Sequence, residues 1–116
     1  MAYDPVLLKM MWDRLIAVVD EADTALGRTA FSTVVREAHD YVTVLLDADG
    51  RSIAQCTYSI PSFIGTLPIT AREIMKRIPP SSLQPGDVLI TNDPWLGTGH
   101  LPDITMLTPI FYGGRL

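Results

Sequence analysis

Near the N-terminus the apolar residues recur every three or four positions, which is the spacing of an amphipathic helix. Asp4-Pro5 favours a helix start, because an Asp side chain can accept hydrogen bonds from free backbone N–H groups and proline fits the first helical position. We expect this helix to run to about Leu26 and to end at Gly27. Its inner face is predicted to carry Leu8, Met11, Trp12, Leu15, Val19, Ala22 and Leu26, with Lys9, Asp13, Asp20 and Asp23 on the other side.

Additional apolar residues make this stripe wider than one sheet face needs. A stripe that contains Met and Trp is more often core than a cofactor pocket. Its extra width also favours a second partner surface. The residues that widen it are Val6, Leu7, Met10, Ile16 and Val18.

The next pattern predicts a short helix and then a β-hairpin. Residues 30–38 could form the helix, with Ser32 or Thr29 near its cap. Residues 41–46 are β-branched, aromatic or apolar, and the turn-forming residues 47–50 lead into a second run at 51–56.

A second amphipathic helix is predicted at residues 67–78, after a loop at 61–66. Its inner side is predicted to carry Ala71, Ile74, Met75 and Ile78, with Pro68 in the first turn. Residues 84–87 form a predicted tight turn before a short strand at Val88–Ile90, and a further apolar run extends from Ile104 to Phe111. Helices and strands without regular alternation indicate an α+β fold, with a long N-terminal helix, a β-hairpin and mixed strands.

The last residues suggest an interrupted hairpin. A strand ending near Tyr112 is followed by Gly113-Gly114, a favourable hairpin turn, and by the opening of a strand at Arg115-Leu116. At 116 residues the chain has the length of one modest domain. We therefore expect residues 1–116 to be the N-terminal part of a longer domain.

Composition narrows the range of partners. The chain is 47% hydrophobic and 19% charged, with a formal charge of −4 and no cluster of Lys or Arg, so neither nucleic acid nor an anionic membrane surface is an expected partner. Its apolar segments are too short or too charged to span a bilayer. The first residues lack the basic region of a signal peptide, which makes a cytoplasmic location the expectation. The single cysteine, Cys56, excludes an internal disulfide.

The richest candidate chemistry lies in residues 91–103, Thr-Asn-Asp-Pro-Trp-Leu-Gly-Thr-Gly-His-Leu-Pro-Asp, between two predicted strands. Pro94 and Pro102 restrict the backbone, while Gly97 and Gly99 permit tight or left-handed turns. An imidazole and a carboxylate three positions apart, at His100 and Asp103, could bind Mn²⁺, Fe²⁺ or Zn²⁺ together.

Each of these residues also has a structural interpretation. His100 and Asp103 could simply form a hydrogen-bonded pair, and Asp93 could close an Asx turn rather than act in catalysis. Cys56 is expected to be a packed apolar residue, and His39 a solvated or capping histidine, with metal binding or proton transfer as the less common roles. The Gly97-Thr98-Gly99 segment lacks the pattern of a dinucleotide or ATP loop.

Many separated motifs in order make the chain resemble the B-type subunit of the hydantoinase/oxoprolinase family, which includes the α subunit of acetone carboxylase and the matching half of ATP-dependent 5-oxoprolinase. The resemblance covers nearly the whole chain. Its motifs are Asp4-Pro5-Val6, Asp47-Ala48-Asp49-Gly50-Arg51-Ser52-Ile53-Ala54-Gln55, Gly65-Thr66-Leu67-Pro68, Pro85-Gly86-Asp87-Val88, Asn92-Asp93-Pro94, His100-Leu101-Pro102-Asp103-Ile104-Thr105 and Thr108-Pro109-Ile110-Phe111.

The resemblance implies an enzyme that hydrolyses a cyclic amide, or carboxylates a ketone, at a divalent metal ion. Mn²⁺ is the expected metal, with Fe or Zn as alternatives, held by His100, Asp103 and a histidine beyond Leu116. Asp93 is then the candidate catalytic residue, and Gly97 and Gly99 are candidate substrate contacts. The resemblance further implies a hetero-oligomer with an A-type subunit that binds ATP.

Two positions depart from the common family pattern. Many members have Gly-Gly-Thr-His where this chain has Gly97-Thr98-Gly99-His100, and many have a histidine where Phe63 stands, which leaves the substrate open. A competing hypothesis is a non-catalytic interaction domain that docks a partner subunit through its apolar N-terminal helix. A third is an independent domain without a site of its own.

Overall fold

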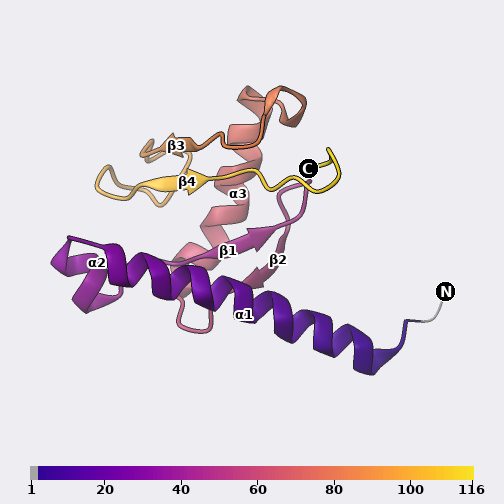
Figure 1. Ribbon diagram of the computed structural model, residues 1–116. Helices are drawn as coiled ribbons and strands as arrows, with labels where there is room; N and C mark the ends of the chain where they lie inside the picture. The colour runs from indigo at the N-terminus through magenta and orange to yellow at the C-terminus, as the bar shows by residue number, and fades with distance from the viewer. Residues whose placement is uncertain (1–2) are drawn as a thin grey trace. The chain divides into compact units, whose positions relative to one another are not determined.

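The computed structural model describes residues 3–116, which divide into two compact units (Figure 1). The first unit contains the described residues up to 46 together with 52–64, and the second contains 47–51 and 65–116. Helices and two small antiparallel sheets make up the described chain, so the predicted α+β class is confirmed.

Helix α1 (Pro5–Thr29) begins as predicted and ends later than predicted. The Val6 N–H donates to the Asp4 carboxylate at 2.9 Å, which caps the first turn. The predicted stop at Gly27 is wrong, because the helix continues to Thr29. A Cβ atom at Gly27 would lie 2.3 Å from the hydroxyl oxygen of Tyr41. This glycine therefore makes room for a neighbouring side chain instead of ending the helix.

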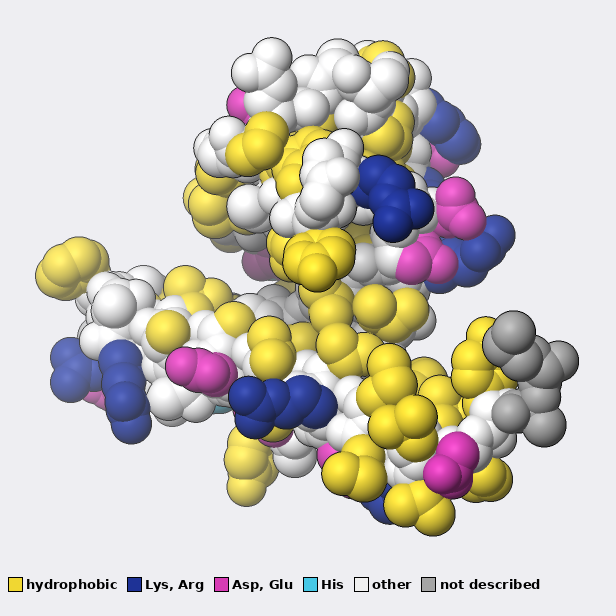
Figure 2. Space-filling model, turned by 45° about the vertical axis from the view of Figure 1, so that its right-hand side comes forward, with side chains coloured by type: hydrophobic (Ala, Val, Ile, Leu, Met, Phe, Trp, Pro, Cys, Tyr) yellow, Lys and Arg dark blue, Asp and Glu magenta, His cyan; other side chains and the backbone are white. Residues whose placement is uncertain are grey.

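Only part of the predicted inner face of α1 is buried. The core of the first unit contains Val19, Ala54 and Cys56, and the half-buried residues Leu15, Ile16, Val42 and Leu45 pack against it. The N-terminal half of α1 is exposed, and Figure 2 shows its hydrophobic side chains gathered on the surface. The prediction of the inner face is therefore right for Leu15 and Val19 and wrong for the exposed residues Leu8, Met11, Trp12, Ala22 and Leu26.

Asp23 was expected on the polar face of α1 but is buried. Helix α2 (Thr33–Ala38), which Ser32 caps, ends at His39 in a left-handed conformation with φ 53°. This conformation directs the imidazole back to α1, where His39 Nε2 lies 3.2 Å from Asp23 Oδ2. The Asp23 side chain is only 8% exposed, so its burial depends on this pairing. His39 is thus the capping residue that was expected, with a neighbouring carboxylate that was not.

The hairpin of β1 (Val44–Leu46) and β2 (Ser52–Gln55) is confirmed, with strands shorter than predicted and a shift in register between Leu45 and Leu46. Two side-chain contacts tie it to α1. Thr43 Oγ1 donates to the Val19 carbonyl at 3.1 Å, and the Thr57 N–H and hydroxyl donate to the Asp20 carboxylate at 2.6 and 2.8 Å.

Helix α3 (Pro61–Arg77), whose residues from Gly65 onward belong to the second unit, starts about six residues before its predicted position. The predicted loop at 61–66 is wrong, since Pro61 itself begins the helix and Pro68 is tolerated inside it at the loss of one backbone hydrogen bond. Its buried residues are Thr70, Ala71 and Ile74.

A short 3₁₀ helix, η1 (Pro80–Ser82), and the predicted turn follow, with the Asp87 N–H donating to the Gln84 carbonyl at 3.1 Å. Strands β3 (Leu89–Thr91) and β4 (Thr105–Leu107) then pair antiparallel, with Ile90 opposite Met106. Strand β3 is shifted by one residue from the predicted Val88–Ile90, and β4 is shorter than the predicted run from Ile104 to Phe111. The Gly-Gly turn is confirmed by the bridge between Tyr112 and Arg115. Within residues 3–116, no helix is long and apolar enough to cross a membrane.

Substituting Gly27 by Ala tests the close approach of Tyr41. Glycine to alanine inside a helix usually stabilises by about 1 kcal/mol. Here we expect a loss of about 1 kcal/mol or more, because the new methyl group meets the Tyr41 hydroxyl. Urea denaturation measures the change. In a Tyr41→Phe background the loss should become smaller, because only the ring carbon at 3.3 Å remains close, and Gly65→Ala, whose Cβ meets nothing within 4 Å, is the matched control that should stabilise.

The variant His39→Asn tests the buried pair, because asparagine tolerates the left-handed conformation and removes the imidazole. We expect the free energy of unfolding to fall by about 1 to 3 kcal/mol, since Asp23 loses its partner while still buried. Arg36→Gln, on the exposed side of α2, should change it by less than about 0.5 kcal/mol. Equal effects of the two variants would show that Asp23 does not depend on His39.

Candidate functional site

The connection between β3 and β4, residues 92–103, is organised by Asp93. Its carboxylate Oδ1 accepts the Trp95 N–H at 2.9 Å, and its backbone carbonyl accepts the N–H groups of Leu96 and Gly97 at 3.1 and 3.0 Å. One residue therefore receives three backbone donors, and residues 93–97 close into a tight turn. We name residues 92–103 the site loop.

Further hydrogen bonds attach the site loop to the rest of its unit. The hydroxyl of Thr70, a residue of α3 that is 1% exposed, donates to the Leu96 carbonyl at 2.6 Å. The Asn92 side-chain amide donates to the Leu101 carbonyl at 3.2 Å, which joins the two ends of the loop. Polar contacts therefore hold the loop in addition to the backbone restriction that was expected from Pro94 and Pro102.

The two glycines of the loop have different surroundings. Gly99 adopts φ 99°, a conformation that favours glycine, and a Cβ placed there would meet nothing within 4 Å. A Cβ at Gly97 would lie 3.4 Å from the Asp93 carbonyl oxygen. A distance of 3.4 Å is an ordinary van der Waals contact, so the turn leaves room for a side chain at Gly97, while Gly99 leaves open backbone next to His100.

The structure brings His100 and Asp103 together. His100 Nδ1 lies 3.3 Å from Asp103 Oδ2, with the imidazole 58% exposed and the carboxylate 20% exposed. Asp103 Oδ2 is itself buried and accepts no hydrogen bond from any described residue. A buried carboxylate oxygen in that state has unused capacity to bind a cation or a donor.

The separation of the pair fits shared binding of one metal ion. Two atoms that bind one ion at about 2.1 Å lie about 3.0 to 3.4 Å apart for angles between 90° and 109°. The measured 3.3 Å falls in this range, although an ion pair without metal would have the same separation. No group of three or more His, Cys, Asp or Glu side chains that could hold a metal occurs among residues 3–116. The pair is therefore at most part of a ligand set.

Sequence reasoning did not single out Thr98 and Trp95. Thr98 Oγ1 is buried and finds no hydrogen-bond partner among the described residues, so the loop contains a second unsatisfied polar atom besides Asp103 Oδ2. Trp95 is 94% exposed. Neither residue carries a sequence signal, because a lone Thr and a lone Trp occur in many loops without a ligand.

Asp93 forms the Asx turn that was the structural alternative to catalysis. Its Oδ1 accepts the Trp95 N–H, so Oδ2 is the atom that a proton-transfer role would use.

Cys56, in the first unit, is packed in the core. Burial raises the pKa of the Cys56 thiol above its usual value, and Cys56 is 1% exposed, as expected for a packed residue that is a poor nucleophile.

Comparison with known proteins gives one family. The model of the family described as "Hydantoinase B/oxoprolinase" matches residues 4–116. The chain is 40% identical over 113 residues to an uncharacterised protein of Schizosaccharomyces pombe and 37% identical over 108 residues to the 5-oxoprolinase of Saccharomyces cerevisiae. It is 31% identical over 116 residues to the putative B-type subunit of a D-/L-hydantoinase from a Pseudomonas species.

These matches cover 97%, 93% and 97% of the chain. The chain, in contrast, spans 8% of the length of each of the two fungal proteins and 19% of the bacterial subunit. No solved structure matches it.

The variant Thr70→Val tests the attachment of the site loop to α3, since valine keeps the shape and loses the hydroxyl. We expect the free energy of unfolding to fall by about 1 to 2 kcal/mol, because the Leu96 carbonyl loses its donor at a buried position. Thermal or urea denaturation measures the change. Thr108→Val, at an exposed position after β4, is the matched control and should be near neutral. A neutral Thr70→Val would mean that the loop does not depend on this contact.

Proposed function

Because the chain belongs to the hydantoinase B/oxoprolinase family, we propose that it forms part of an ATP-dependent enzyme that opens a cyclic amide ring, with His100 and Asp103 as metal ligands. The observation that carries the proposal is the buried Oδ2 of Asp103, which accepts no hydrogen bond from the described residues and lies 3.3 Å from His100 Nδ1. The names 5-oxoprolinase and D-/L-hydantoinase among the relatives support cyclic amides as the substrate class.

A bound divalent cation, with Mn²⁺ expected and Fe²⁺ or Zn²⁺ as alternatives, would supply Lewis-acid chemistry by polarising the amide carbonyl. Two donors leave most of its coordination sphere to other groups, so a further histidine of the full polypeptide belongs to the proposal. Within this chain, His100 and Asp103 hold the cation, Asp93 Oδ2 accepts or returns a proton, and the open backbone at Gly99 contacts the substrate. Ketone carboxylation at the same site is the alternative reaction.

An ATP-binding partner also belongs to the proposal, since the site loop has no phosphate-binding pattern. The matched segment is 8% of the yeast 5-oxoprolinase and 19% of the bacterial subunit, so the yeast chain is more than twice as long. This difference is what one expects if an A-type ATP-binding part is fused in the longer proteins and separate in the bacterial ones. The protein would then act as a hetero-oligomer wherever the two parts are separate.

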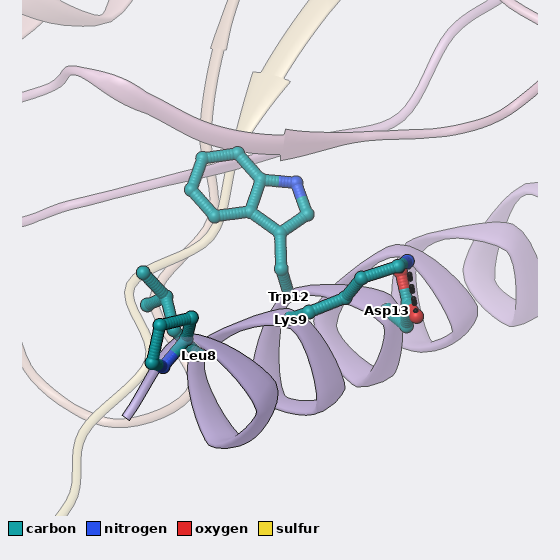
Figure 3. Close-up of a pocket in the computed structure, with 5 residues that line it drawn as sticks. Leu8, Lys9, Trp12 and Asp13 are labelled. Atoms are coloured by element: carbon teal, nitrogen blue, oxygen red, sulfur yellow. Dashed lines mark hydrogen bonds and ion pairs between the residues drawn. The ribbon is translucent and has the colours of Figure 1, made fainter. Parts of the chain in front are cut away.

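A second candidate function is docking of a partner through α1. Six apolar residues in its first two turns are each at least half exposed, namely Val6, Leu7, Leu8, Met10, Met11 and Trp12. A shallow groove runs along this helix between Leu8 and Trp12, and Figure 3 shows the Lys9 and Asp13 pair beside it. An apolar face of this size on a helix is typical of a covered surface. Docking is compatible with the enzymatic proposal.

Removing one ligand tests the metal site. In the full-length polypeptide, His100→Ala should weaken Mn²⁺ binding by about 100-fold or more, because a lost ligand exceeds the usual 10- to 100-fold effect of its supporting contacts. Asp103→Asn should act in the same direction. Calorimetric titration with Mn²⁺ measures the affinity, and Asp49→Asn, an exposed carboxylate of the hairpin turn, is the control.

Unchanged Mn²⁺ affinity in His100→Ala would refute the ligand assignment and leave docking as the remaining function. For docking, Leu8→Asp should weaken association with the ATP-binding partner and leave Mn²⁺ affinity intact. The two variants therefore separate the two candidate functions.

A further inference from the structure

Trp95 combines almost complete exposure with a fixed backbone. Its side chain is 94% exposed, although tryptophan is the largest apolar residue and gains most from burial. Its own N–H is bound by Asp93 Oδ1, and the next two N–H groups are bound by the Asp93 carbonyl. The Leu96 carbonyl is bound by Thr70. The backbone that carries the exposed indole is therefore fixed by hydrogen bonds and is not a loose loop.

An aromatic side chain held in water on a rigid turn is suited to bind a ligand. The loss of backbone freedom has already occurred in the free protein, so binding needs to fix only the two side-chain torsions of the indole. The contact then gains the free energy that burial of the ring would give, together with the preference of aromatic faces for flat partners.

The neighbouring residues indicate what kind of ligand would lie there. Leu96, Gly97 and Thr98 are half-buried, so the accessible side chains of residues 95–100 are the indole at one end and the His100 imidazole at the other. Between them Gly99 presents bare backbone, and a Cβ added there would have no neighbouring atom within 4 Å. Between the indole and the imidazole, the loop therefore presents open backbone at Gly99 and no exposed side chain.

We propose that Trp95 is a substrate-contacting residue whose indole stacks on the ring of a cyclic amide, and that it selects such rings over small ketones. The inference rests on the proposed function. A five-membered amide ring is nearly flat, because its N–C=O group is conjugated, and it offers a face of several atoms to the indole. An acyclic ketone of three or four carbons covers far less of the indole and gains correspondingly little.

The test uses the full-length polypeptide together with its ATP-binding part, and 5-oxoproline and hydantoin as probes. Trp95→Ala should raise KM for the ring substrate that is turned over by about tenfold, which corresponds to a lost stacking contact, and should leave kcat within about twofold. Trp95→Phe, which keeps a smaller ring and the fold, should raise KM by only about two- to threefold. Mn²⁺ affinity should be unchanged in both variants, because neither removes a proposed ligand.

A binding measurement makes the inference independent of turnover. Titration with 5-oxoproline or hydantoin should quench tryptophan fluorescence, and the part of this quench that comes from Trp95 should be missing in Trp95→Phe. Other tryptophans of the full polypeptide contribute equally to both proteins, so the difference between the two titrations reports on Trp95. Tyr112→Ala, which removes another aromatic side chain that is 88% exposed in the same unit, should leave KM and the quench unchanged.

An unchanged KM in Trp95→Ala, or a quench in Trp95→Phe as large as in the parent protein, would overturn the inference while Mn²⁺ binding and ring opening stand. An equal rise in KM for Tyr112→Ala would also overturn it, because the effect would then be general to exposed aromatics. Failure of the proposed function has a different signature, which is intact Mn²⁺ affinity in His100→Ala. In that case the ring-dependent quench from Trp95 still decides whether the indole meets a cyclic amide.

Discussion

The backbone carbonyl and carboxylate of Asp93 are the acceptors on which the candidate site depends. They bind three successive N–H groups, and the Thr70 hydroxyl fixes the carbonyl of the residue that follows Trp95. These contacts are local to one unit and need neither a large core nor a bound ligand. They fix residues 93–97 of a connection of twelve residues, in which His100 lies 3.3 Å from Asp103 and the imidazole is 58% exposed.

The chain contains two His and Asp pairs of nearly equal length, and their surroundings separate their roles. In the first unit, His39 lies 3.2 Å from Asp23, whose side chain is 8% exposed on a helix that packs against the hairpin. In the second, His100 lies 3.3 Å from Asp103 on a loop with open backbone at Gly99. The first pair serves the packing of α1 and α2. The second has the more exposed imidazole and open backbone at its neighbour Gly99.

The sequence predicted those features that local chemistry controls. The Asp4 cap, the hairpin turn, the Gln84 to Asp87 turn and the glycine turn near Tyr112 are set by residues close in sequence, and all four are present. One miss is local, since Pro61 begins α3 where a loop was predicted, and two others depend on distant partners. Gly27 looks like a helix stop until the Tyr41 hydroxyl is seen beside it, and Asp23 looks like a surface residue until His39 is seen turning back to it. For the site, the motif identified His100 and Asp103, while the support from Thr70 and the exposure of Trp95 have no local signature.

Amide hydrogen exchange in the metal-free protein tests most directly whether the site loop is formed before any ligand binds. The account predicts that the N–H groups of Trp95, Leu96 and Gly97 exchange at least about 100-fold more slowly than in an unstructured peptide, because each donates to Asp93. Addition of Mn²⁺ should then change their protection little. Exchange at the unstructured rate without metal, with protection only after Mn²⁺ is added, would contradict the account.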